Sequence, residues 1–192
     1  MVKKHKLLYL MIVLTMIFSS STISLANVSD IDGHWAKGDI VYLMEKNVMS
    51  GYSDGSFRPN NSITRAEFIK MVNNVYGFKE MGDIQFADVK ESHWFYDDIK
   101  KAVAVGYISG YEDGTMKPNA AITRQEAAKM LALASGLDEE VSDKQINFKD
   151  KDKISQWAIE YVKFMVDKGY LSGYEDGTFR PERQITRGET AK

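Results

Sequence analysis

The sequence predicts a mostly α-helical fold made of three tandem helix–loop–helix units. A Gly-Tyr-x-Asp-Gly loop recurs three times, an Ile-Thr-Arg-x-Glu box follows each loop, and a Trp precedes each loop at a constant offset. Apolar residues at helical spacing follow each Trp and each box. Because a two-helix unit of about 60 residues has little core of its own, we expect the three units to share one core as a pseudo-threefold domain.

The N-terminal residues have the features of an export signal. Three Lys precede an apolar run over residues 7–18, and Ser24-Leu25-Ala26 then supplies the small residues that a signal peptidase recognises. The run is too short to span a bilayer comfortably, so we predict cleavage after Ala26 and no membrane insertion of the mature chain. We therefore divide the chain into a signal peptide at 1–26 and three units at 27–82, 83–142 and 143–192.

Composition narrows the possible partners. With 44% hydrophobic and 27% charged residues, the chain has an ordinary globular composition. Removing the signal takes three Lys from 25 basic residues and leaves 22 against 27 acidic ones, a net charge of −5. Such a chain repels nucleic acid, and no stretch interleaves basic and aromatic residues to overcome this. The lack of Cys excludes disulfides and a cysteine-linked lipid, and we expect no cofactor.

Each unit opens with an Asp, reaches its Trp, and continues into a first helix of about 12 residues with an i, i+3, i+4 apolar stripe. We interpret the opening Asp as an N-cap or an Asx turn. At one equivalent position after each stripe, the residue is of a type that readily adopts a left-handed conformation and ends the helix. The opening acids are Asp30, Asp88 and Asp150, and the helix-ending residues are Asn47, Gly106 and Gly169.

The glycine loops then connect the first helix to the second. Asp-Gly within each loop predicts a tight turn, and the residue before the loop Pro is expected to be extended. A calcium loop needs oxygen ligands at alternating positions, whereas a single Asp stands here, so the turn is the preferred interpretation. The loops span Gly51–Pro59, Gly110–Pro118 and Gly173–Pro181.

The box that follows each loop predicts the start of the second helix. Its Thr stands three residues before its Glu, the spacing of a capping box, so both side chains have a local structural role. The Arg between them occupies the first helical position, where we expect it to point outward beside the positive helix end and to form an anion site. In grooves between neighbouring units, we expect the Arg of one copy to approach the loop or the Trp of another. Since a first-turn Arg supports no cap, its loss should leave stability nearly unchanged. The boxes contain Arg65, Arg124 and Arg187, and their glutamates are Glu67, Glu126 and Glu189.

The third unit stops after the second turn of its second helix. Ala191 and Lys192 align with Ile69 and Lys70. We interpret the chain as a fragment whose third unit is truncated, and we expect it to be less stable than a chain with a completed helix.

Catalytic and metal functions have weaker support. Glycosidases need two converging carboxylates, whereas each box Glu is expected to satisfy its own helix start. His34 and His93 precede two of the Trp residues, but Gln156 takes this place in the third unit, so we expect no metal site. The Trp residues could be core anchors, which residue statistics favour, or sugar-stacking platforms, and we keep them as binding candidates. We predict no enzyme activity.

The Trp-initiated helix, the Ser-Gly-Tyr-x-Asp-Gly-Thr-Phe-Arg-Pro loop and the Ile-Thr-Arg-Ala-Glu box, in three copies, resemble the S-layer homology family over about residues 28–192. The third unit departs from the family pattern through Gly188 in its box and through its short helix. These two departures put a groove built on the third unit in question.

The resemblance implies a non-catalytic anchor that holds an S-layer or surface protein to the wall of a Gram-positive bacterium. Its partner would be a secondary cell wall polysaccharide that carries pyruvylated N-acetylmannosamine, whose carboxylate suits an Arg. The alternatives are a protein-interaction module that docks other S-layer subunits, or the targeting part of a surface exoenzyme. The family motif marks as ligand-binding candidates Arg65, Arg124, Arg187, Trp35, Trp94, Trp157, Gly51, Gly110 and Gly173.

Overall fold

The computed structural model describes residues 28–136 and 145–192. The predicted signal peptide lies outside these residues. Each unit contributes a first and a second α-helix, and the described residues contain only isolated β-bridges in place of strands. The predicted helical fold class is therefore confirmed. The first helices are α2 (Lys37–Glu45), α4 (Tyr96–Val105) and α6 (Ile159–Asp167), and the second helices are α3 (Arg65–Tyr76), α5 (Arg124–Ala134) and α7 (Arg187–Ala191).

The first helices are shorter than the 12 residues expected, with 9, 10 and 9 residues. The difference arises at their N-termini, because each Trp lies in a turn two residues before its helix begins. Their C-termini follow the sequence pattern. Asn47, Gly106 and Gly169 have φ angles of 56°, 87° and 77°, so the predicted left-handed residues are confirmed.

The second helices begin at the three predicted capping boxes. In α3, Thr64 Oγ1 accepts the N–H of Glu67 and Glu67 Oε2 accepts the N–H of Thr64. The same reciprocal pair opens α5 and α7. Local sequence thus determines where these helices start, because both halves of each cap lie within four residues.

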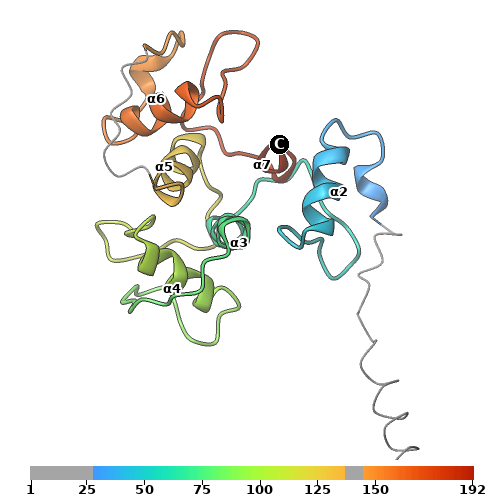
Figure 1. Cartoon of the computed structure of the whole chain (residues 1–192), viewed down its shortest axis with the longest axis vertical. Coiled ribbons are helices and arrows are strands. Elements are labelled where there is room, and N and C mark those ends of the chain that lie inside the picture. Colours follow the sequence, from blue (N-terminus) through green and yellow to red (C-terminus); the bar gives the residue numbers. More distant parts are fainter. Residues whose placement is uncertain (1–27, 137–144) are drawn as a thin grey trace, which may run out of the picture.

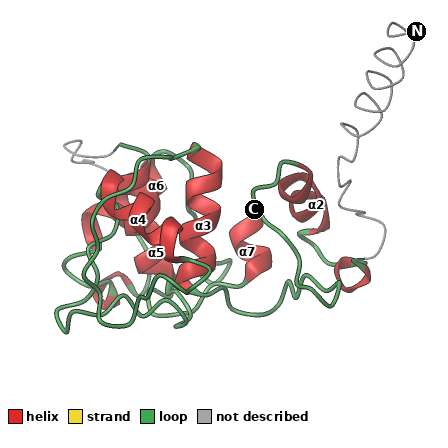
Figure 2. Cartoon of the chain, turned by 90° about the horizontal axis from the view of Figure 1, so that it is seen from below, coloured by secondary structure: helices red, strands yellow, loops and turns green. Residues whose placement is uncertain are grey.

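Each second helix packs on the first helix of the next unit. Helix α3 packs against α4, α5 against α6, and α7 against α2, so the last unit returns to the first. Figure 1 shows α3, α5 and α7 near the middle of the molecule, with α2, α4 and α6 outside them. Figure 2 shows α7 beside α2 at one end. The units therefore depend on one another for packing.

Backbone hydrogen bonds close a cycle through the segments before the second helices. Ile63 N–H donates to Ile185 O at 3.1 Å, Ile122 N–H to Ile63 O at 3.1 Å, and Ile185 N–H to Ile122 O at 3.2 Å. Each buried Ile thus gives one bond and receives one. This cycle favours a pseudo-threefold arrangement of whole units, which stays a prediction.

The buried side chains form two clusters. The larger spans the first two units and includes Ile185 and Ala191 of the third. The smaller contains residues of α5 and α6 and includes the fully buried Val162 and Phe179. In the part of the chain that the structure describes, no helix has the length and hydropathy needed to cross a membrane.

The opening Asp of each unit has a different role from the one expected. Asp88 makes no local cap, and its carboxylate instead accepts the backbone N–H groups of Met116 and Lys117 at 2.8 Å each. Asp30 and Asp150 bind the equivalent loop positions in their units. The N-cap or Asx-turn interpretation is wrong, because the partners lie at the far end of each glycine loop.

The residue before each loop Pro also differs from expectation. Arg58, Lys117 and Arg180 have φ angles of 58°, 50° and 58°, so they are left-handed and the predicted extended conformation is wrong. The opening Asp provides the reason, since it accepts the N–H of this residue and stabilises a conformation that is otherwise unfavourable. The predicted Asp-Gly turns are confirmed: Asp54 Oδ1 accepts the N–H of Ser56, and Gly55 has a φ of 83°.

Candidate ligand-binding groove

The Arg of each box leaves its own unit and enters the glycine loop of a neighbouring unit. Arg187 donates from Nε to Phe57 O at 2.8 Å, from Nη2 to Ser50 O at 2.8 Å, and from Nη1 to Glu67 Oε1 at 3.1 Å. Its guanidinium also lies over the ring of Tyr52. The expectation that the motif Arg approaches the loop of another copy is confirmed.

Arg65 is held in the same way by the second unit. It donates from Nε to Met116 O at 3.1 Å and from Nη1 to Glu126 Oε1 at 3.0 Å. Arg65 and Arg187 are each only 4% exposed, so the expected outward orientation is wrong for both. Their charges are matched by the glutamates of neighbouring boxes, because those glutamates face the loop into which the Arg inserts.

Glu67 and Glu126 therefore cap their own helices and also bond a residue of another unit. Glu67 Oε1 accepts the Tyr52 hydroxyl at 2.8 Å as well as Arg187, while Oε2 completes the cap of α3. Burial raises the pKa of Glu67, but hydrogen bonds from Thr64 and Tyr52 and the charge of Arg187 outweigh it and hold the pKa below its usual value. Tyr111 in the second unit bonds Glu126 in the same way, and burial with this bond raises its pKa to about 12.

The three Trp side chains are exposed, in contrast to the core position that residue statistics favour. Trp35, Trp94 and Trp157 are 59%, 58% and 47% exposed. Each ring lies under a Lys of another unit, which stands in the second helix or, for Lys192, directly after it. The three pairs are Lys70 with Trp94, Lys129 with Trp157, and Lys192 with Trp35. An aromatic face at the surface beside a cation is a suitable platform for an anionic sugar.

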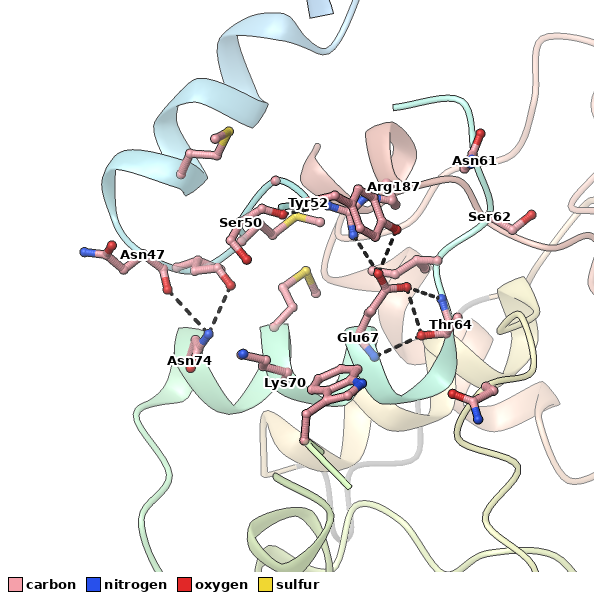
Figure 3. A pocket seen from close by; sticks show the side chains of 18 of the residues that line it. Asn47, Ser50, Tyr52, Asn61, Ser62, Thr64, Glu67, Lys70, Asn74 and Arg187 are labelled. Atoms are coloured by element: carbon pink, nitrogen blue, oxygen red, sulfur yellow. Dashed lines mark hydrogen bonds and ion pairs between the residues drawn. The ribbon is translucent and has the colours of Figure 1, made fainter. Parts of the chain in front are cut away.

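A groove of about 1050 Å³ runs between the first unit and Trp94 of the second. Figure 3 shows Glu67, Tyr52 and Arg187 meeting at one part of it, Asn74 at the opposite end bonding the backbone of Asn47, and Lys70 between them. The ammonium of Lys70 lies 5.4 Å from the Trp94 ring centre. The lining residues that carry polar groups include Asn61, Ser62, Asn74 and Asn119.

The three loop glycines have a steric role. A Cβ at Gly51 would lie 2.9 Å from Ser56 O, and at Gly110 it would lie 2.5 Å from Phe86 Cε1. At Gly173 it would meet Phe148 Cε1 at 2.6 Å. Only Gly51 lines the groove of Figure 3, so close packing of the loop explains the glycines without a ligand.

The groove brings together three of the predicted candidates and residues that the sequence analysis did not propose as ligand-binding. Arg187, Gly51 and Trp94 line the groove, whereas Arg65 lies against the second loop and Trp35 and Trp157 stand beside other helices. The missed residues are Lys70 and Tyr52. A signal for Lys70 exists in the sequence, because a Lys stands five residues after the motif Arg in all three units.

In residues 28–136 and 145–192, no three His, Asp or Glu side chains are grouped so as to hold a metal ion. His34 bonds Asn60 and the Ala36 N–H, and His93 accepts the Lys90 N–H.

The S-layer homology domain model matches three segments, residues 29–69, 85–128 and 147–191. These segments carry the three loops and boxes and cover more than half of the chain. The chain belongs to the S-layer homology domain family. Each matched segment ends within a second helix, and each includes the Asp that binds its own loop.

Several curated proteins share this domain. The chain is 37% identical over 150 residues to a cellulosome-anchoring protein of Acetivibrio thermocellus, covering 74% of this chain and 33% of that protein. It is 37% identical over 153 residues to cell surface glycoprotein 1 of the same organism, covering 74% and 7%. It is 32% identical over 168 residues to exoglucanase XynX of Acetivibrio thermocellus, covering 85% and 15%. The chain thus spans a third or less of these relatives' lengths.

Proposed function

We propose that this chain is a non-catalytic anchor that attaches a surface protein non-covalently to the bacterial cell wall. The relatives named as anchoring and cell surface proteins support this role. The enzyme among them aligns with the chain over only 15% of its length, which is consistent with a module separate from catalysis. Export after cleavage at Ala26 and the unit boundaries at residues 82 and 142 form part of the proposal.

The proposed ligand is an anionic secondary cell wall polysaccharide with a pyruvylated N-acetylmannosamine. The observation that carries this is the exposed pair of Lys70 and Trp94 in one groove. Within the described residues Lys70 makes no ion pair, so its ammonium can bind a carboxylate while the Trp94 ring stacks on a sugar face. Asn61 and Ser62 offer hydrogen bonds to hydroxyl or acetamido groups.

In this proposal, the nine candidate residues contribute unequally to ligand binding. Trp94, Gly51 and Arg187 belong to the first groove, and Lys70 joins them as its charged contact. Arg187 already has Glu67 as a partner, so its main contribution is to hold the groove wall in place. The equivalent pairs Lys129–Trp157 and Lys192–Trp35 give two further candidate sites.

Co-sedimentation with purified wall sacculi tests the proposal. The chain should bind native walls, and it should lose binding to walls stripped of polymer or depyruvylated. Lys70→Gln and Trp94→Ala should each weaken binding by roughly tenfold. Lys79→Gln, at another exposed Lys, is the matched control. Undiminished binding to stripped walls would reject the carbohydrate ligand and indicate a protein partner.

A further inference from the structure

The glycine loop of the third unit is followed by a charged residue that the other two units lack. Arg183 stands where Asn61 and Ala120 stand in the first two, as their backbone contacts show. Arg187 N–H donates to Asn61 O, Arg65 N–H to Ala120 O, and Arg124 N–H to Arg183 O. These three positions are therefore equivalent, and only the third carries a cation.

Arg183 changes the partners of the motif Arg that enters this loop. Its Nη1 donates to Glu189 Oε1 at 2.5 Å and to the hydroxyl of Tyr174. In the other two loops the corresponding glutamate binds the motif Arg itself. Glu189 is thus engaged by an Arg of its own unit, and Arg124 is deprived of the carboxylate that Arg65 and Arg187 have.

Arg124 keeps only neutral contacts in the described part of the chain. It donates from Nε to Phe179 O at 2.8 Å and from Nη2 to Ser172 O at 2.9 Å, and it lies over the Tyr174 ring at 4.7 Å. Burial lowers the pKa of Arg124, and the neighbouring Arg183 lowers it further, although nearby Tyr174 and Glu189 act against this. A partly buried cation without an ion-pair partner is costly unless an anion approaches it.

The charged groups around the loop tyrosine show an excess of positive charge in the third unit. Tyr52 has Arg58 and Arg187 over its ring, and these are paired with Asp54 and Glu67. Tyr174 has three guanidinium groups near its ring, with Asp176 and Glu189 as the paired acids. These three groups belong to Arg124, Arg180 and Arg183.

A second cation of the third unit is equivalent to Lys70 of the first unit. Lys70 and Trp94 line the first groove together with Tyr52 and Glu67. The corresponding pair in the third unit is Lys192 and Trp35 of the first unit. The third unit therefore has one positive charge from Lys192 at this position, as the other units have from their Lys, and one more from the Tyr174 cluster.

We infer that the third unit holds an oxyanion site, built from Arg124 and Arg183 beside Tyr174, that prefers ligands with two negative charges. A phosphate monoester fits this description, because its oxygens can accept from two guanidinium groups at once. A monocarboxylate matches the single cation of the other grooves. Because Arg124 and the Lys192–Trp35 pair are also candidates of the proposed wall-binding function, the inference concerns which anions this third position prefers. Its residues lie outside the groove of Figure 3.

NMR titration of the full chain, with signals of the Arg Nε–Hε groups, tests the site. The probes are inorganic phosphate, sulfate and acetate at low ionic strength and constant pH, since salt screens such contacts. Phosphate and sulfate should shift the Arg124 and Arg183 signals and bind roughly tenfold more tightly than acetate. Equal affinities for acetate and phosphate, or shifts spread evenly over all arginines, would show an adventitious ion only and overturn the proposal.

Substitutions at Arg183 and at its equivalent Asn61 provide a pair of matched variants. Arg183→Asn should free Glu189 for Arg124 and lower phosphate affinity roughly tenfold, while wall binding through Lys70 stays unchanged. In the parent chain, Arg187 pairs with Glu67 beside Tyr52. Asn61→Arg should engage Glu67 instead and create a second phosphate site at Tyr52. Phosphate binding that is unaltered in Arg183→Asn would overturn the assignment, whether or not the chain binds walls.

Discussion

The arginine of the repeated box is the residue whose role depends most on distant parts of the chain. Arg187 and its carboxylate partner Glu67 are separated by 120 residues. Sequence reasoning placed this Arg correctly at the first turn of a helix and brought it near the loop of another unit. It could not show that a glutamate already matches the charge, because that glutamate also satisfies a local capping pattern.

Removing Arg187 should lower the stability of the first unit, in contrast to the expectation from sequence. Arg187→Ala deletes a buried ion pair and two hydrogen bonds to loop carbonyls, so the free energy of unfolding should fall by about 2–4 kcal/mol. Urea denaturation measures this change. Arg58→Ala is the control, since its pair with Asp54 is exposed and should matter little. Equal stability of the two variants would contradict the structural role of Arg187.

Glu67 should also contribute to the pH dependence of stability. Its folded pKa lies below the ordinary value of 4.5, so the ionised form stabilises the fold above that value. This contribution is lost as the pH falls from 4.5 through the folded pKa. Glu67→Gln should therefore unfold with a shallower pH dependence between about pH 5 and about pH 3.

Thermal unfolding monitored by circular dichroism over this pH range would show the difference. Exposed Glu112→Gln should keep the steeper dependence of the parent chain. If Glu67→Gln follows the parent curve, the contacts of Glu67 with Arg187 and Tyr52 are weaker in solution than their geometry indicates.

At the scale of single elements, the helices follow from local sequence and the loops do not. Both partners of each capping box lie within four residues, and the left-handed positions at the ends of the first helices are local too. The glycine loop depends instead on Asp88 and its equivalents, which lie 27 to 30 residues before their partners. An Asp repeated in all three units was a signal for this contact, but its partner could not be inferred from spacing.

Loss of the opening Asp should therefore destabilise the loop that it binds. Asp88→Ala leaves the N–H groups of Met116 and Lys117 without their acceptor, and Lys117 has a left-handed φ of 50°. Stability should fall by about 1–3 kcal/mol, and amide exchange at residues 110–118 should accelerate. Asp88→Asn, which keeps one oxygen acceptor, should lose less. Unchanged amide exchange in this loop of the variant would show that the loop keeps its conformation without Asp88.

At the scale of the whole molecule, the repeated motifs predicted three helix–loop–helix units that share packing. They could not predict the order of contact, in which α3 meets α4, α5 meets α6 and α7 meets α2. That order depends on the direction in which each chain segment leaves its neighbour, and the backbone cycle through Ile63, Ile122 and Ile185 fixes it. The exposed Trp residues were likewise beyond sequence reasoning, since burial of an aromatic ring depends on elements from another unit.

The cycle predicts that a change in α7 alters the local stability of the first unit. Removing residues 187–192 withdraws Arg187 from Phe57 O and Ser50 O, and it takes Ala191 out of the larger core cluster. Amides of α2 and of residues 50–67 should then exchange faster with solvent, while those of α6, which belong to the smaller cluster, change much less. Hydrogen exchange measured by mass spectrometry resolves these segments. Uniform acceleration through all three units would indicate one cooperative unit, and no change in the first would mean that the contact of α7 with α2 contributes little to its stability.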